Sequence, residues 1–245
     1  IAVGIQLISD RIVSEAQEMI RRDLNAAREI YLNDLDRLND VIHFTASRFF
    51  LREALLSANL QQVTEELVKV KEREKLDILT LTDQSGQVLF RTSNMDRFGD
   101  NQSHDELVSA ALDIKGPVSA TAIVTADNLQ KESPLLAEQA YFKFIDTPKA
   151  RARPETEETS GMMLKAAAPI FDDQNNLIGV LYGGVLLNLN FYIVDKTKQT
   201  VFEDINYSGK DIGKATIFQD DFRISKNVRN PDGSRAHGNR VSEEF

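Results

Sequence analysis

The stretch 161–185, GMMLKAAAPIFDDQNNLIGVLYGGV, consists of two apolar segments around a short polar linker. Residues 161–170 and 177–185 carry the apolar character of strands, and FDDQNN between them is rich in Asp and Asn, which favour turns. Two such segments around a short polar linker predict a β-hairpin. Within the second strand, Gly183 and Gly184 indicate either a bulge or a close approach of another backbone.

Shorter segments with strand character precede this hairpin. They cover residues 77–82, 87–92, 118–125 and 140–145. Gly86 ends a polar turn between the first two, and 104–112 has the spacing of a short amphipathic helix. The pattern predicts an antiparallel sheet of about five strands with helices before it, which is an α+β domain over residues 51–190.

A long helix is predicted before the sheet. Residues 9–50 contain neither Gly nor Pro, and apolar residues recur there every three or four positions from Ile12 to Ile42. A helix of this length spans about 60 Å, which is longer than a small domain is wide. Part of it therefore needs a partner outside its own core, and a second copy of the chain is the simplest partner. The alternative is an ordinary surface helix that breaks near Arg37.

The flanks of this helix leave further alternatives open. Residues 1–8 form an apolar run that is either the end of a membrane-spanning helix or the first turns of a soluble one, because eight residues alone cannot cross a bilayer. Residues 51–75 continue as two shorter helical pieces with a break near 57–59.

After the hairpin, the pattern predicts a connecting helix over 190–202 and a second meander. Its strands are expected at 213–218 and 222–228, with a further turn at 230–233. Two or three strands do not form a stable sheet alone, so this second unit needs more chain or a neighbouring element.

The amino-acid composition argues against several classes of function. The chain has 245 residues, a net charge of −9 and no cysteine. The acidic balance argues against nucleic acid as a partner, and the lack of cysteine excludes disulfides and thiol catalysis. Its apolar and charged fractions, 42% and 27%, are those of a soluble globular protein.

No catalytic or metal-binding motif is present in the sequence. His43, His104 and His237 lie in separate segments without a second ligand at metal spacing, and no phosphate-binding or nucleophile motif occurs. The carboxylate pairs at 172–173 and 220–221 occur in predicted turns, where Asp is common. We therefore expect neither an enzyme nor a cofactor or metal site.

Two cations are unusual for their positions. Arg91 ends an apolar strand, and Lys165 is the only charge within MMLKAAA. A cation on the covered face of a sheet is costly unless an opposite charge meets it, and that charge could belong to a protein carboxylate or to a bound anion. Alternatively, each cation points to solvent on the other face. Tyr141 and Lys143, which alternate along the strand predicted at 140–145, are weaker candidates of the same kind.

These features resemble a known family. The long helix, the meander, Arg91 followed by Gly99-Asp100, and the hairpin APIFDDQNNLIGVLYGGV together resemble a double-Cache (PAS-like) sensor domain of bacterial transmembrane receptors. The segment GKATIFQDDFRISKNVRNPDGSRAHGNRVSEEF resembles the opening of the second module. The resemblance implies a signalling helix over 1–50, a membrane-distal Cache domain over 51–190, and a connector with an incomplete second module over 191–245.

The resemblance also implies ligand-binding residues. In related citrate and dicarboxylate sensors, an Arg, a His three residues later and a basic residue on a later strand hold carboxylates. Arg91 and Lys165 match the two basic positions, but Asn94 stands where the pattern has His, so the ligand need not be a di- or tricarboxylate. In the second module, Lys226 and Asn239 stand where the pattern has Thr, which puts a second site in doubt.

The expected function is extracytoplasmic sensing of a small organic ligand, most simply a carboxylate. The expected context is the periplasmic part of an inner-membrane receptor, with membrane spans on both sides, a kinase or chemotaxis output, and a homodimer formed through the N-terminal helix. The alternative is a structural or protein-interaction ectodomain without a small ligand. A space filled by side chains around Arg91 and Lys165 would favour that alternative.

Overall fold

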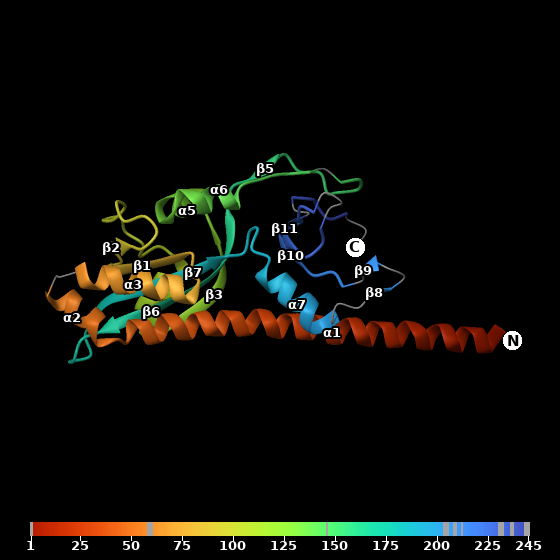
Figure 1. Cartoon of the computed structure of the whole chain (residues 1–245), viewed down its shortest axis with the longest axis horizontal. Helices are drawn as coiled ribbons and strands as arrows, with labels where there is room; N and C mark the ends of the chain where they lie inside the picture. Colours follow the sequence, from red (N-terminus) through yellow and green to blue (C-terminus); the bar gives the residue numbers. More distant parts are fainter. Residues whose placement is uncertain are drawn as a thin grey trace.

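The structure is a computed structural model that describes residues 2–57, 61–145, 147–202, 206–207, 210–211, 213–229, 233–235 and 238–242. Its main feature is helix α1, Ala2–Ala46, which runs unbroken along the length of the molecule (Figure 1). Its 45 residues span about 68 Å. The predicted long helix is therefore confirmed, the alternative break near Arg37 is wrong, and the helix ends four residues earlier than expected.

Two different environments surround α1. Toward its C-terminal end, Leu38, Ile42 and Ala46 are buried against the sheet. Between residues 12 and 24 the helix is largely exposed, and apolar side chains such as Ile20 and Leu24 face solvent there. None of the described helices has the length and apolar character needed to cross a bilayer.

Helices α2, Phe49–Ser57, and α3, Gln61–Glu74, come after α1 as the two predicted shorter pieces. Residues 58–60 between them lie outside the described part of the chain. Strands β1, Ile78–Asp83, and β2, Val88–Arg91, then form the first hairpin. Its turn contains Gly86 at φ +82°, a conformation that favours glycine.

The remaining strands of the sheet are β3, Val118–Val124, β6, Gly161–Phe171, and β7, Leu177–Leu186. The five strands lie in the order β2-β1-β7-β6-β3, and all neighbouring pairs are antiparallel. The predicted five-stranded antiparallel sheet and its central hairpin are confirmed. Helix α4, Glu106–Ile114, precedes β3 and starts at Asp105, which caps it.

The strand expected at 140–145 is wrong as a member of this sheet. Two unpredicted helices occupy most of the preceding segment: α5, Ala126–Glu132, and α6, Pro134–Ala140. Thr125 caps the first, and Pro134 stands at the first position of the second, where proline is well tolerated. The chain then forms strand β4, Phe142–Lys143, which pairs with β5, Glu157–Glu158, as a separate ribbon.

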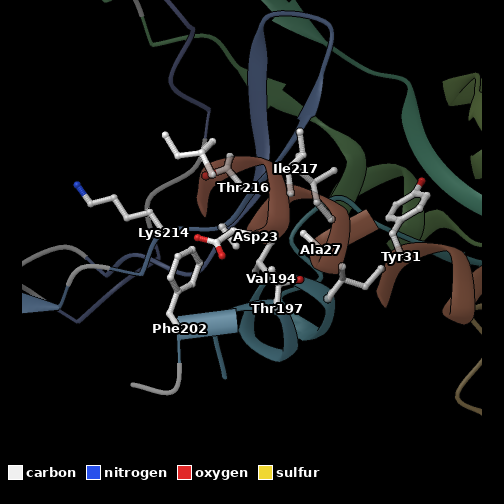
Figure 2. Close-up of a pocket in the computed structure, with 13 residues that line it drawn as sticks. Asp23, Ala27, Tyr31, Val194, Thr197, Phe202, Lys214, Thr216 and Ile217 are labelled. Carbon is white, nitrogen blue, oxygen red and sulfur yellow. The ribbon is translucent and has the colours of Figure 1, made fainter. Parts of the chain in front are cut away.

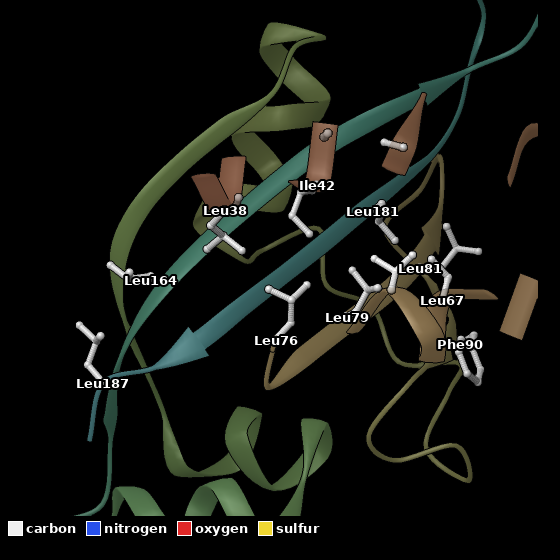
Figure 3. Close-up of a cluster of buried hydrophobic side chains, with 14 of the residues drawn as sticks. Leu38, Ile42, Leu67, Leu76, Leu79, Leu81, Phe90, Leu164, Leu181 and Leu187 are labelled. Atoms are coloured by element: carbon white, nitrogen blue, oxygen red, sulfur yellow. The ribbon is translucent and has the colours of Figure 1, made fainter. Parts of the chain in front are cut away.

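Both faces of the five-stranded sheet are covered. Helices α1, α2 and α3 lie against one face, called here the α1–α3 face, and α4, α5 and α6 cover the other, the α4–α6 face. Figure 1 shows α1 on one side of the sheet and α5 and α6 on the opposite side. Sheet side chains toward the α1–α3 face are apolar and form the main core (Figure 3). They include Leu79, Leu81, Phe90, Leu164, Ala166, Ala168 and Leu181.

The glycine pair in β7 allows close packing on both sides. A Cβ on Gly183 would lie 2.7 Å from Ile42 Cδ1 of α1 and 3.0 Å from the backbone oxygen of Ile78, and one on Gly184 would lie 2.7 Å from the backbone oxygen of Leu164. Of the two explanations predicted for this pair, close approach is therefore the one observed. The bulge in the hairpin occurs elsewhere, between Ile170 and Phe171 of β6.

The second unit begins with helix α7, Tyr192–Phe202, which packs against α1. Strands β10, Thr216–Gln219, and β11, Phe222–Lys226, form the predicted second meander. Short strands β8, Asn206–Tyr207, and β9, Lys210–Asp211, pair before it. Of the turn expected at 230–233, only Gly233 is described, at φ +84°.

Candidate functional site

Arg91 lies on the α4–α6 face and is fully buried. Its Nη1 and Nη2 donate to the two carboxylate oxygens of Asp100 at 2.6 and 3.0 Å, and its Nε donates to Oε1 of Glu132 at 3.0 Å. Asp100 belongs to the loop after β2, and Glu132 is the last residue of α5. A planar guanidinium suits such two-pronged binding of a carboxylate.

Lys165 also points to the α4–α6 face and is buried. Its Nζ forms an ion pair with Oδ2 of Asp105 and lies 4.9 Å from the centre of the Tyr182 ring. Oδ1 of Asp105 accepts hydrogen bonds from the first backbone amides of α4. Both unusual cations thus face the covered side of the sheet, each with a protein carboxylate, and the alternative in which they point to solvent is wrong.

Tyr182 and Thr80 join the two cations into one network. In the sheet register, Thr80 of β1 lies opposite Arg91 on one side and opposite Tyr182 of β7 on the other. Residues directly opposite each other in an antiparallel sheet project to the same face. Thr80 Oγ1 and Tyr182 Oη donate to Glu132 at 2.7 and 2.6 Å. Glu132 therefore accepts three hydrogen bonds from one row of sheet residues.

Burial and hydrogen bonding shift the pKa values of Arg91, Asp100 and Tyr182 and thereby fix their protonation states. Burial alone would lower the pKa of Arg91, but hydrogen bonding to Asp100 and the charge of Glu132 outweigh it and raise that pKa. The hydrogen bonds from Arg91 lower the pKa of Asp100 to about 2. Burial, and then the Glu132 charge, raise the pKa of Tyr182 well above its ordinary value. At neutral pH Arg91 is cationic, Asp100 is ionised and Tyr182 is a hydrogen-bond donor.

The other three residues predicted to bind a ligand, Asn94, Tyr141 and Lys143, lie in different parts of the structure. Asn94 is close to the network, since its Nδ2 donates to the backbone carbonyl of Lys131 at 2.9 Å, one residue before Glu132. Tyr141 and Lys143 are exposed near the β4–β5 ribbon, outside the five-stranded sheet. The hydroxyl of Tyr141 donates there to Glu157 at 2.8 Å. The structure thus brings together Arg91, Lys165 and Asn94, but not Tyr141 and Lys143.

Sequence reasoning missed the acidic half of the network, which consists of Asp100, Asp105 and Glu132. Asp105 could have been recognised as a helix cap, because it immediately precedes an apolar-periodic segment. Ser133-Pro134 is a typical helix start, and it would have indicated the helices that position Glu132.

No group of residues that could hold a metal ion occurs in the described ranges. His43 lies against Phe44, with ring centres 5.5 Å apart, and His104 is exposed. His237 falls outside the described residues.

A second charged cluster lies around Asp221, near the β10–β11 hairpin. Asp221, at the β10–β11 turn, accepts hydrogen bonds from Arg153 at 2.9 Å and from Arg240 at 2.9 and 2.6 Å. Arg153 comes from the loop before β5, so this ion pair ties that loop to the second meander. Of the two positions at which the family pattern has Thr, Lys226 lies at the end of β11, and burial, then nearby Arg223 and Lys214, lower its pKa.

A cavity of about 430 Å³ lies between α1, α7 and residues 214–217 (Figure 2). Its walls are mostly apolar, and Asp23 and Lys214 are its charged lining residues. It is separate from the Arg91 network, because none of the network residues lines it.

The chain thus combines a long helix, a covered antiparallel sheet and a buried charged network under small helices. The family described as the double sensory domain of two-component sensor kinases matches residues 14–203, and the family of single Cache domain 3 matches residues 185–245. The chain belongs to the double-Cache sensory family, whose members are sensory modules rather than catalytic domains.

Solved structures of sensor domains are similar to this chain at low sequence identity. The periplasmic domain of Vibrio cholerae LuxQ is 16% identical with a TM-score of 0.51, over 86% of this chain and 79% of that one. The sensor domain of E. coli DcuS is also 16% identical, with a TM-score of 0.44, over 71% of this chain and 98% of that one. No curated protein matches the chain.

Proposed function

We propose that this chain is the periplasmic input region of an inner-membrane receptor and that it binds a small carboxylate on the α4–α6 face. The observation that carries the proposal is the row of donors formed by Thr80, Arg91 and Tyr182, with Lys165 beside it. Buried cations and hydroxyls directed toward one point are the groups that recognise a carboxylate. We propose residues 51–190 as the ligand-binding module, 1–50 as its signalling helix, and 191–245 as a connector with the start of a second module.

Asn94, Tyr141 and Lys143 have different places in this proposal. Asn94 lies beside the network and would contact a ligand that enters near Lys131. Tyr141 and Lys143 would take part only if the β4–β5 ribbon moved toward the sheet.

The proposed signal is a shift between two conformations. A ligand changes such an equilibrium only when it binds one state more tightly than the other. Helix α1 packs on the opposite face of the same sheet and continues well beyond it. We propose that α1 carries the change to flanking membrane spans and a kinase or chemotaxis output.

We also propose a homodimer through α1. Its support is the exposed apolar series Ile12, Met19, Ile20 and Leu24, which is unusual for a solvated helix. Sedimentation equilibrium should give a dimer for the wild type and a monomer for Leu24→Glu, with Asn25→Glu, at an exposed position off the apolar series, as a control. A monomeric wild type would contradict the dimer.

One observation favours the alternative of an ectodomain without a small ligand. Arg91 and Lys165 already have protein carboxylates as partners, so their charges are satisfied within the chain. Such a network can be purely structural. The choice between the two functions therefore depends on binding measurements.

Titration calorimetry with acetate, succinate and citrate tests the proposal. We expect at least one of these acids to bind the wild type and to lose at least tenfold in affinity in Arg91→Lys, which keeps the charge and removes the two-pronged geometry. Arg28→Lys, on the exposed face of α1, is the matched control. Equal affinity in wild type and Arg91→Lys would exclude the assigned site, and no binding of any acid would favour the alternative.

A further inference from the structure

Within the described part of the chain, the hydrogen bonds to the Glu132 carboxylate come from side chains of the sheet. Thr80, Arg91 and Tyr182 donate to it at distances of 2.6 to 3.0 Å. The side chain is 7% exposed, although it comes from α5, a helix of seven residues that covers the sheet. A short covering helix therefore inserts an acid into a site that the strands build.

The donors form a fixed array. Arg91, Thr80 and Tyr182 occupy one row across β2, β1 and β7, three neighbouring strands of the sheet. One guanidinium and two hydroxyl groups that converge on a carboxylate constitute an anion-binding arrangement. Because the array belongs to the sheet, its geometry does not depend on which carboxylate occupies it.

Charge balance prevents a further carboxylate from simply joining this network. Two buried cations, Arg91 and Lys165, already face three carboxylates, those of Asp100, Asp105 and Glu132. A fourth carboxylate would leave a buried negative charge without a partner, which is strongly unfavourable. A ligand acid must therefore displace one of the three.

Glu132 is the residue that a ligand would displace. Asp105 is held by the first amides of α4 in addition to Lys165. Asp100 is held by Gln102 and by two nitrogens of Arg91. The bonds described above for Glu132 all come from the donor row, and its helix lies on the surface of the sheet.

We propose that Glu132 is a tethered competitor that occupies the ligand's carboxylate position. This inference rests on the proposed function and adds its regulation: a ligand carboxylate takes the donors of Thr80, Arg91 and Tyr182, and α5 leaves the sheet with Glu132. A tethered group competes at an effective concentration of about millimolar or more. Glu132 thereby sets the threshold concentration at which a carboxylate is sensed.

Glu132→Gln tests this inference, because it keeps the side-chain volume and removes the competing charge. We expect acetate or succinate, titrated at constant ionic strength with chloride as the reference anion, to bind Glu132→Gln at least tenfold more tightly than wild type. Asp127→Asn removes the same charge from the exposed side of α5 and should leave the affinity unchanged. The increase in affinity for the acid should disappear in the double variant Glu132→Gln/Arg91→Lys.

The outcomes separate the inference from the proposed function. If wild type binds an acid through Arg91 but Glu132→Gln shows no gain, Glu132 is only a structural partner and the inference fails alone. If neither protein binds any acid, both fail. A gain that survives the Arg91→Lys change places the ligand elsewhere and overturns the inference.

A second measurement covers the case in which Glu132→Gln does not fold. Hydrogen exchange of the wild type with and without saturating succinate should show faster exchange of the α5 amides, residues 126–132, and unchanged exchange in β1 and β7. Protection or no change in α5 in the presence of bound succinate would overturn the displacement.

Discussion

The two faces of the five-stranded sheet are both buried, but they are built from different side chains. The α1–α3 face carries leucines and alanines that contact the long helix. The α4–α6 face carries Thr80, Arg91, Lys165 and Tyr182, which need partners with opposite charge or hydrogen-bonding capacity. Apolar burial stabilises a domain without such partners. Apolar packing occurs under α4–α6 as well, around Met163, Val180 and Leu186, so both faces stabilise the domain, and the α4–α6 face differs in adding the polar row that we propose for binding.

The largest predicted effect comes from breaking the charged network on one side only. Arg91→Ala leaves Glu132 and Asp100 without their cation, and removal of one partner of a buried pair costs about 3–5 kcal/mol. Replacement of the fully buried pair by apolar residues, in Arg91→Met/Glu132→Leu, should recover part of this loss, because partly exposed Asp100 still lacks its cation and the hydroxyls of Thr80 and Tyr182 lose their acceptor. Urea unfolding followed by circular dichroism measures both free energies of unfolding.

The relative stability of Arg91→Ala and the double variant can also contradict this prediction. If the double variant is as unstable as Arg91→Ala, the network is needed for stability and the functional distinction between the faces fails. We expect instead a stable protein that no longer binds carboxylates.

A core substitution on the other face should have a somewhat smaller effect on stability and none on binding. Leu181→Ala in β7, next to Tyr182, removes buried methyl groups and should cost about 3 kcal/mol. The affinity of the folded fraction for a carboxylate should equal that of wild type, measured by calorimetry well below the unfolding temperature. A large loss of affinity would mean that the faces do not act separately.

The smallest predicted effect is a pH dependence that belongs to the α4–α6 face. Asp100 has a folded-state pKa of about 2, below its ordinary value of 3.8, because Arg91 holds its ionised form. A depressed pKa contributes stability that is present above the unfolded pKa and is lost as the pH falls through the folded one. Urea midpoints should therefore fall between pH 3.8 and about 2 in wild type.

Asp100→Asn provides the control for this pH dependence. It should show a shallower decline of the urea midpoint over the same range, because the titrating group is gone. Parallel curves for the two proteins would contradict the assignment of this component to Asp100.

The elements that were predictable are those with a strong local signal. The 161–185 hairpin was evident from two apolar segments around an Asp- and Asn-rich turn, and α1 from an uninterrupted helical period. The buried positions of Arg91 and Lys165 were one of two alternatives raised by charge within apolar strands. In each case the local pattern agrees with the tertiary environment.

The parts that were not predictable depend on contacts distant in sequence. Glu132 meets Arg91 across 41 positions and Tyr182 across 50, and neither separation leaves a local pattern. The strand at 140–145 was predicted because its β-branched and aromatic residues favour extended structure. It does not join the sheet, because Ser133-Pro134 and the helices around it direct the chain away. The partner of a buried charge is therefore determined by tertiary contacts and cannot be identified from the neighbouring sequence.

The absence of a side chain at Gly183 lets α1 pack directly on the backbone of β7. Ile42 of α1 rests almost directly on the β7 backbone at this residue, and the adjacent residue is Tyr182, which bonds to Glu132. Close-packed interiors are poorly compressible and transmit displacements. In the proposed signalling, a shift of β7 at Tyr182 would therefore act on α1 without an intervening side chain at residue 183.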